Sequence, residues 1–530
     1  MYDLLIKHGA VMDGTGSAPF MADIAAQGGN IVALGQLAAE AHTVVDASGA
    51  VVAPGFIDLH THSDLSFLLD PTAQSKVRQG VTLELAGNCG SSFCAPLHGA
   101  APDMLRPRVS QYTDDFTPTW NDFGGYLDAL QQARATLNLA VQVGHGTVRA
   151  CVLGMEAQAP SGAELERMKT LVAESLDAGA LGFSTGLFYA PGYYARLDEV
   201  IELAAVAAAR GKLYSTHLRD EGNHSVGLFV ALNEAIEIGR RTGIRVQISH
   251  VKCMGPAVWG RAHDVLDLFE RTRREGIDIA GDQYPYTAGS TSLTGALFPR
   301  WALEGGRDAT LRRQADREER QRLHADITAN FTQRSSAEGV FIARFVPEPQ
   351  LEGLNMVHIA AALGCDPAEA VMRLYERGDA SVILHVIQEP DMETIAQHPL
   401  IAVGSDGSSL ATEGILSVGK PHPRSYGTNP RFLAQFVRQR RLMSLEEAVR
   451  KMTLLPASRL GLTRRGRIAP GFAADLVVFD PDTIADTATF EAPHSYPTGV
   501  SHVAVNGVLV VADGVFTGRT PGKIIRDFRD

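Results

Sequence analysis

Eight short runs of β-forming residues, most of them ending in polar side chains, alternate with helical stretches from about residue 55 onward. A strand followed by a crossover helix, repeated along a chain, is typical of a parallel sheet covered by helices. Because eight such units close a sheet on itself, the pattern predicts an α/β fold with a (β/α)8 barrel, the TIM-barrel architecture. The predicted strands are residues 55–60, 81–88, 139–146, 181–186, 213–217, 245–250, 277–284 and 401–406.

Apolar residues between these runs keep helical spacing and predict the outer ring of helices. Ser444 and Glu447 match a capping box at the start of a further helix after the eighth strand. We therefore expect the barrel to span residues 55–461. The helical spacing is clearest at Leu165, Met168, Val172 and Leu176, and at Val265, Leu268 and Phe269.

The two ends of the chain differ from the middle, because both consist of short alternating strands with glycine turns. We expect residues 1–54 and 462–530 to form one small β-sandwich domain, since chain termini commonly lie close together in space. The stretch from about 288 to 400 is too long for a simple loop. Its helical, Arg-rich middle (residues 307–335) predicts a lid-like insertion after strand seven.

Composition and charge narrow the class of function. The net charge of −12 and a pI near 5.8 provide no broad basic field for nucleic acid or an anionic membrane surface. Asp3 interrupts any signal-peptide pattern at the N-terminus, and no apolar run is long enough to span a bilayer. The five cysteines are odd in number and scattered, which argues against a disulfide framework. We expect a cytoplasmic protein that acts on a small molecule.

Metal-ligand side chains stand at the ends of several predicted strands. His60 and His62 point to the same side of strand one, because alternate residues of a strand share a face. In a barrel of this kind the active site lies at the carboxyl ends of the strands. Imidazole and thiolate are good Zn²⁺ ligands, so the pattern predicts a catalytic metal site. The other candidate ligands end strands two, five, six and eight: Cys89, His217, His250 and Asp406.

Each of these residues also has a structural interpretation. Cys89 fits an ordinary buried cysteine, and Asp406 fits a cap of the next helix. His145, at the end of strand three, is assigned to a structural or supporting role. The remaining histidines considered are assigned no role and are expected on the surface or in loops: His98, His224, His263, His324 and His398.

Several longer motifs are far more specific than the paired histidines. They are APGFIDLHTHSD (53–64), GNCG (87–90), GFSTGLFYAPG (182–192), STHLRDEG (215–222), SHVKCMG (249–255), DQYPYTAGSTSL (282–293), GSDG (404–407) and PHPRSYGTNPR (421–431). With these motifs the chain resembles, nearly from end to end, the N-acyl-D-amino-acid deacylases (D-aminoacylases) of the amidohydrolase superfamily. The resemblance implies the barrel and the small β-domain described above.

The resemblance also implies a metal arrangement. One tightly bound zinc is expected on Cys89, His217 and His250, and a second, weaker metal position on His60, His62 and Asp406. In the hydantoinase and dihydroorotase branches of the superfamily a carboxylated lysine on strand four bridges two metals. The end of strand four in this chain, GFSTGLFY, contains no lysine.

For the reaction, the resemblance implies hydrolysis of an N-acyl-D-amino acid to a carboxylate and a free D-amino acid. A zinc-activated water is the expected nucleophile and Asp406 the general acid and base. Arg424, Lys252 and Tyr284 are the expected substrate-binding residues, with arginine best suited to the α-carboxylate. Residues 408–420 lengthen the loop before Arg424 relative to the usual family spacing.

The acyl or side-chain pocket is expected to involve Phe188 and Tyr189, which follow strand four, although aromatic residues there also fit a core role. Members of the family that act on acidic D-residues place an arginine after the QYPY motif. This chain has Leu297 and Phe298 there, followed by Arg300, which favours neutral or apolar D-amino acids.

Two alternatives remain open at this point. One is a cyclic-amide hydrolase of the hydantoinase or dihydroorotase type, which shares the barrel and the paired histidines. The other is a non-catalytic scaffold that keeps the amidohydrolase fold. The sequence leaves the oligomeric state open.

Overall fold

The computed structural model describes residues 1–38, 40–334 and 336–530. Its central element is an eight-stranded parallel sheet in the order β16-β12-β11-β10-β9-β8-β7-β6. Each of the eight predicted runs overlaps one of these strands, which confirms the predicted barrel. The strands are β6 (Phe56–Asp58), β7 (Val81–Ala86), β8 (Asn138–Gly144), β9 (Gly182–Gly186), β10 (Leu213–His217), β11 (Arg245–Ile248), β12 (Ile279–Gln283) and β16 (Ile401–Val403).

The barrel closes just beyond the regular parts of its first and last strands. Thr61 and Gly407 form a parallel bridge, and the Asp406 amide donates to the His60 carbonyl at 2.8 Å. The His62 amide donates to the Gly407 carbonyl at the same distance. The chain segments that carry the predicted ligands of strands one and eight are therefore joined by backbone hydrogen bonds.

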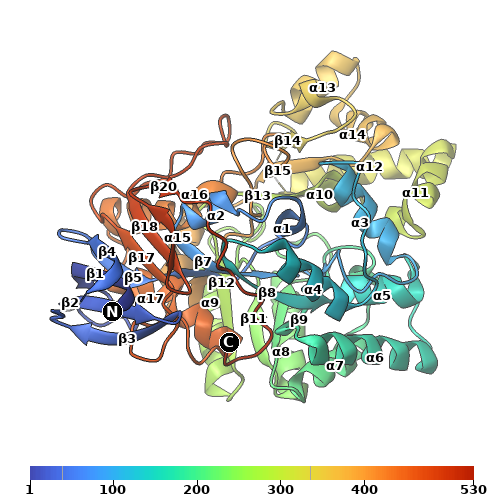
Figure 1. Ribbon diagram of the computed structural model, residues 1–530. Helices are drawn as coiled ribbons and strands as arrows, with labels where there is room; N and C mark the ends of the chain where they lie inside the picture. The colour runs from blue at the N-terminus through green and yellow to red at the C-terminus, as the bar shows by residue number, and fades with distance from the viewer. Residues whose placement is uncertain (39, 335) are drawn as a thin grey trace.

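Amphipathic helices surround the barrel (Figure 1). In α6 (Gly162–Ala178) the predicted core positions Met168, Val172 and Leu176 are buried. Ser444 accepts a hydrogen bond from the Glu447 amide at the start of α17 (Leu445–Met452), as the capping motif predicts. The other barrel helices include α5 (His145–Leu153), α7 (Leu197–Ala208), α8 (Leu228–Thr242), α9 (Ala262–Arg274), α15 (Glu389–Gln397) and α18 (Leu454–Leu460).

Strands from both ends of the chain form one nine-stranded sheet beside the barrel, at the left of Figure 1. Antiparallel pairing of β5 (Val51–Pro54) with β17 (Leu476–Phe479) joins the N-terminal and C-terminal halves of this sheet. The sheet encloses its own apolar core, to which Ile24 and Val52 contribute. Its other strands are β1 (Tyr2–Val11), β2 (Phe20–Gln27), β3 (Asn30–Gly35), β4 (Ala41–Asp46), β18 (Val500–Val505), β19 (Val508–Ala512) and β20 (Val515–Phe516).

The last residues of the chain leave this sheet and return to the barrel. The Leu139 amide donates to the Lys523 carbonyl at 2.9 Å, and the Ile525 amide donates to the Leu139 carbonyl at 2.8 Å. Ile525 is fully buried in an apolar cluster with barrel residues. The C-terminal tail therefore packs on the barrel rather than within the small β-domain.

Between β12 and β16 the chain forms an insertion that projects from the barrel, at the upper right of Figure 1. It contains a three-stranded antiparallel sheet, in the order β13-β15-β14, packed with helices. The strands are β13 (Ala288–Ser292), β14 (Val340–Arg344) and β15 (Ser381–His385), and the helices are α10 (Leu293–Leu297), α11 (Gly306–Ala315), α12 (Arg317–Arg334), α13 (Met356–Leu363) and α14 (Pro367–Arg377).

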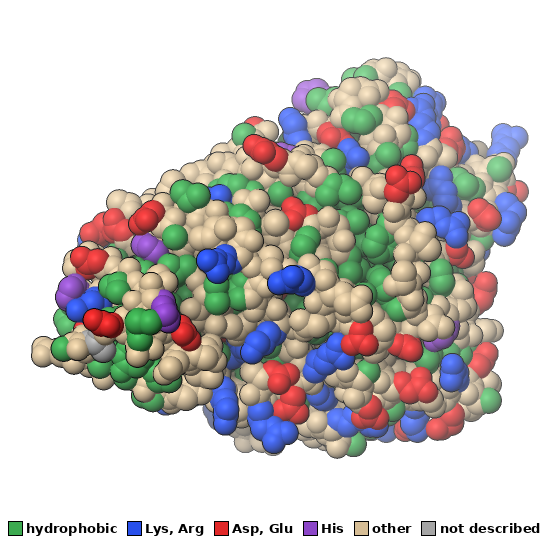
Figure 2. Space-filling model, in the orientation of Figure 1, with side chains coloured by type: hydrophobic (Ala, Val, Ile, Leu, Met, Phe, Trp, Pro, Cys, Tyr) green, Lys and Arg blue, Asp and Glu red, His purple; other side chains and the backbone are tan. Residues whose placement is uncertain are grey.

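The surface drawn in Figure 2 carries acidic and basic side chains side by side, without a broad region of one sign. Within the described part of the chain, no helix combines the length and the apolar character needed to cross a bilayer.

Candidate metal centre and active site

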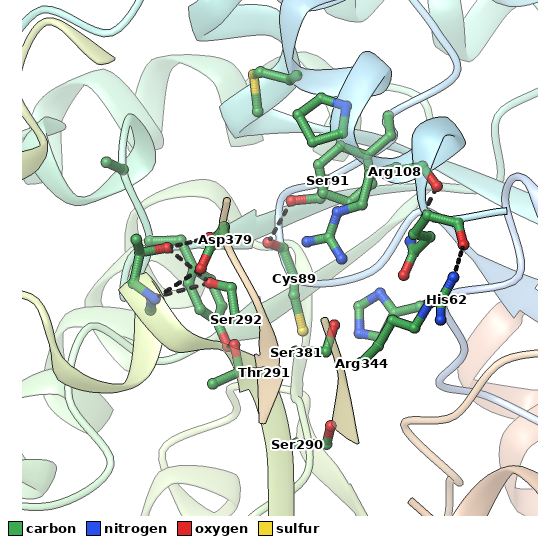
Figure 3. Close-up of a pocket in the computed structure, with 18 of the residues that line it drawn as sticks. His62, Cys89, Ser91, Arg108, Ser290, Thr291, Ser292, Arg344, Asp379 and Ser381 are labelled. Atoms are coloured by element: carbon green, nitrogen blue, oxygen red, sulfur yellow. Dashed lines mark hydrogen bonds between the residues drawn. The ribbon is translucent and has the colours of Figure 1, made fainter. Parts of the chain in front are cut away.

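Five of the six predicted ligands line one cavity of about 1240 Å³ at the mouth of the barrel, and the sixth, His60, is fully buried beside Cys89. Its wall includes His62, Cys89, His217, His250 and Asp406, which follow five different strands. Figure 3 shows His62 and Cys89 on this wall, opposite Ser290, Thr291 and other residues of the insertion. The insertion therefore forms one side of the cavity, and the ends of the barrel strands form the other.

Cys89 lies at the centre of the cluster. Its Sγ is 3.3 Å from His60 Nε2 and 3.5 Å from His250 Nε2. Burial alone raises the pKa of the Cys89 thiol, but the charges of His60 and His250 beside it hold that pKa well below its usual range. The sulfur is therefore in an environment that favours the thiolate, which is the form that binds metals.

The backbone around the cluster is strained. Cys89, His250 and Asp406 have φ values of 53°, 36° and 52°, in the left-handed region that L-residues avoid. Each such residue costs on the order of 1 kcal/mol and persists where the surrounding structure fixes it. Gly87 shows how close the packing is, because a Cβ there would lie 2.1 Å from the Gln142 carbonyl oxygen.

Asp406 faces three cationic or imidazole groups. Its Oδ1 is 3.0 Å from His62 Nε2 and 3.4 Å from His60 Nε2, and its Oδ2 is 2.8 Å from the Arg424 guanidinium. Burial raises the pKa of the Asp406 carboxyl, but Arg424, followed by His250 and His62, holds it well below its ordinary value. The carboxylate is ionised and faces the cavity.

Two carboxylates that the sequence analysis missed hold the histidines in place. Glu221 lies 3.0 Å from His250 Nδ1, 3.4 Å from His217 Nε2 and 2.6 Å from Lys252 Nζ. Asp282 lies 3.0 Å from His60 Nδ1 and accepts the His250 amide at 2.8 Å. Both stand in motifs already noted, STHLRDEG and DQYPY. A carboxylate on the far nitrogen of a metal-binding histidine fixes its tautomer and orientation.

The residues fit a metal ion. Ligand atoms of His60, Cys89, His250 and Asp406 lie within 4.8 Å of one another, as do those of His217, Glu221 and His250. Both ring nitrogens of His217 are buried and lack a hydrogen bond to any described residue. A buried polar atom without a partner is rare in native proteins, and here it stands among thiol and imidazole donors typical of zinc sites.

On the substrate side, Arg424 begins α16 (Arg424–Arg431) and reaches the cavity despite the lengthened loop 408–420. Its guanidinium lies 4.8 Å from the centroid of the Tyr284 ring and donates to the Ser290 carbonyl at 3.3 Å. Tyr189 also lines the cavity, with its hydroxyl 3.0 Å from Thr291 Oγ1. The structure therefore brings Arg424 and Asp406 together as neighbours.

Other expected residues lie behind this wall. The described cavity lining omits Lys252, Tyr284 and Phe188, all of which are buried. His145 lies 2.9 Å from Glu199, in a buried pair outside the ligand cluster. Leu297 and Phe298 belong to the apolar core and not to the described lining of this cavity, whereas Arg300 is part of that lining.

Comparison with known proteins gives consistent matches. A sequence model of the amidohydrolase family matches residues 43–511. An N-acyl-D-glutamate deacylase and a D-aminoacylase, both from Alcaligenes xylosoxydans xylosoxydans, are each 38% identical over 99% of this chain and cover 96% and 97% of their own lengths. Among solved structures, the chain is similar to an N-acyl-D-glutamate deacylase from Bordetella bronchiseptica, crystallised with zinc and a phosphonate mimic of the tetrahedral intermediate. The two sequences are 37% identical, and the structures superpose with a TM-score of 0.83 over 99% of this chain and 100% of that one.

Glu221→Gln is expected to destabilise the metal-free protein by about 3–5 kcal/mol, because it leaves the buried Lys252 ammonium without its carboxylate partner. Glu237→Gln is the matched control, since it removes an exposed carboxylate paired with Arg240 and should change stability by about 0–1 kcal/mol. Urea denaturation measures both. Equal effects of the two substitutions would show that Glu221 does not hold Lys252 in the way described.

Proposed function

The chain belongs to the N-acyl-D-amino-acid deacylase family of amidohydrolases, and from that membership we propose that it hydrolyses the amide bond of N-acyl-D-amino acids. The products are a carboxylate and a free D-amino acid. The proposed cofactor is Zn²⁺, with one ion bound tightly by Cys89, His217 and His250. His60, His62 and Asp406 form a second, weaker position.

The observation that carries this proposal is the composition of the buried cluster at the barrel mouth. A thiol and imidazoles lie within ligand distance of one another, and an ionised carboxylate and a guanidinium stand beside them at the cavity wall. Zinc bound there supplies a Lewis acid that polarises an amide carbonyl and lowers the pKa of a water ligand toward ~7. The zinc-bound relative, 37% identical, supports the same assignment.

The protein's own groups position the substrate and move the proton. Asp406 Oδ1 is the proposed base that accepts a proton from the attacking water and then delivers it to the leaving amine nitrogen. Arg424 is the proposed partner of the substrate α-carboxylate, because a guanidinium matches a planar carboxylate with two parallel hydrogen bonds. Tyr284, stacked on Arg424, and Lys252, paired with Glu221, support these groups from behind.

The pocket for the acyl group or the D-side chain is proposed to include Tyr189, with Phe188 behind it. The preference for a neutral or apolar side chain stays a prediction, because relatives named for glutamate and for D-amino acids in general are equally similar to this chain. A cytoplasmic location is also proposed. Each of the five cysteines is a free thiol in the described structure, which suits a reducing compartment.

The cyclic-amide alternative is less consistent with the chain, because the two-metal site of those enzymes needs a carboxylated lysine on strand four. Residues 182–189, which form β9 and the segment directly after it, contain no lysine. The scaffold alternative is less consistent with the buried His217 nitrogens, which have no hydrogen-bond partner among the described residues unless a metal binds.

The proposed function is tested by a hydrolysis screen with the zinc-loaded protein. The substrates are N-acetyl derivatives of D- and L-leucine, D-methionine, D-glutamate and D-aspartate, with hydantoin and dihydroorotate as cyclic amides. We expect release of the free D-amino acids, fastest for leucine and methionine. Hydrolysis of L-substrates alone, or of cyclic amides alone, would overturn the proposal.

Asp406→Asn is expected to lower kcat by about 10²–10⁴, because the amide cannot accept the water proton. Zinc content is measured alongside kcat to separate proton transfer from metal loss. Asp391→Asn is the control: Asp391 is equally buried but accepts the amides of Gly260 and Ala262, so kcat should remain near the wild-type value. A kcat of Asp406→Asn within a factor of a few of the wild type would refute the assigned role.

A further inference from the structure

A second cavity, of about 540 Å³, lies behind Phe188 between the barrel rim and the insertion. Its wall comes from four separate parts of the chain: Ala157 after α5, the segment after β9, the segment after β10, and the insertion. The lining includes Phe188, Tyr193, Arg219, His224, Arg300 and Arg334. Three of these six residues are arginines.

Arg334 is the most unusual residue of this wall. It is the last residue of α12, its side chain is only 5% exposed, and its Nε has no hydrogen-bond partner among the described residues. Its guanidinium carbon lies 5.0 Å from the centroid of the Phe188 ring. Within the described part of the chain, no carboxylate comes within 4.0 Å of its nitrogens.

Arg300 adds a second positive charge at the same ring. Its guanidinium carbon lies 4.4 Å from the Phe188 centroid, and it donates to the carbonyl of Gly295 at 3.0 Å. Like Arg334, it forms no ion pair with the residues that the structure describes. Two guanidinium groups therefore lie against the Phe188 ring, and neither has a carboxylate partner among the described residues.

The nearby acidic groups are engaged elsewhere. Asp220 accepts the backbone amides of Gly222, His224, Ser225 and Gly227. Asp326 accepts the Trp301 indole N–H at 2.8 Å. Glu234 pairs with Arg219 at 2.7 Å, which neutralises the third arginine of the wall. Glu304 lines the cavity but makes no ion pair with either unpaired guanidinium among the described contacts.

Two neighbouring guanidinium groups without a carboxylate partner, Arg334 buried and Arg300 partly buried, are energetically unfavourable. Burial lowers the pKa of Arg334 to about 9, and the charge of Arg300 beside it acts in the same direction. Buried charges in proteins are normally paired or bound to a ligand of opposite charge, because desolvation costs several kcal/mol per ion. His224 faces the same cavity, and its two ring nitrogens lack hydrogen bonds to described residues.

We propose that this second cavity is a binding site for a small oxyanion, a carboxylate or a phosphate, held between the guanidinium groups of Arg300 and Arg334. A planar guanidinium matches the paired oxygens of such an anion, and the neutral His224 ring supplies one further N–H donor. Phe188 stands between the metal cluster and Arg334, with its ring 5.1 Å from that of His217, whereas Arg300 lines both this cavity and the active-site cavity. It is independent of the proposed deacylase activity.

The test is calorimetric titration of the zinc-loaded protein, freed of excess metal, with inorganic phosphate and, in a separate arm, with acetate. Arg334→Met keeps an apolar side chain of similar length but removes the charge. It should lower the affinity for the better-bound anion by about ten- to a hundred-fold. Arg312→Met is the matched control, since it removes an exposed arginine of the same insertion and should leave the affinity unchanged. The arm with the tighter binding identifies the anion as phosphate or carboxylate.

Arg424→Met separates this site from the active-site cavity, because it removes the guanidinium beside Asp406 and should not affect anion binding behind Phe188. Arg300→Met provides a second variant if Arg334→Met folds poorly, and should weaken binding in the same way. Thermal unfolding gives an independent measure: the anion should raise the Tm of the wild type and of Arg312→Met but not of Arg334→Met. Binding that survives in both Arg334→Met and Arg300→Met, or that is lost only in Arg424→Met, would overturn the proposal, as would the absence of binding of either anion.

Discussion

The closure of the barrel between β6 and β16 is the constraint on which the metal centre depends. Backbone hydrogen bonds between the segments of His60 and Asp406 fix the first and last strands side by side. Because all eight strands are parallel, their carboxyl ends share one rim, and residues more than 300 positions apart in the chain become neighbours. The left-handed backbone at Cys89, His250 and Asp406 is held by this framework, which offsets the local strain.

Much of this arrangement could be predicted from the sequence, because parallel strands place their ends together whatever the details of packing. The meeting of His62, Cys89, His217, His250 and Asp406 follows from that rule. The eight strands follow from the alternation of strand and helix patterns, and the shared sheet of the two termini from the similar strand patterns at both ends of the chain. Glu221 and Asp282 were missed because their role depends on where their oxygens lie relative to the histidine rings. The residues of the side-chain pocket were harder to predict, because apolar residues after a strand pack equally well into a core, as Leu297 and Phe298 do here.

The two cavities differ in how their charges are balanced. Beside the metal cluster the charged groups are paired: Asp406 faces Arg424 and Glu221 faces Lys252. The orphaned atoms there are the ring nitrogens of His217, which a cation would satisfy. Behind Phe188 the unpaired groups are guanidinium ions, which an anion would satisfy. The Phe188 ring thus lies between the metal-ligand cluster and the guanidinium group of Arg334, and Arg300 borders both cavities.

The central claim is that a single zinc on Cys89, His217 and His250 makes the barrel mouth catalytic. Titration of the metal-free protein with Zn²⁺, following hydrolysis of N-acetyl-D-leucine and bound metal together, tests this claim most directly. We expect activity to reach its maximum at one equivalent of bound zinc, and Cys89→Ala to bind no tight equivalent and to stay inactive. Activity that appears only with the second equivalent, or a Cys89→Ala variant that titrates like the wild type, would contradict it.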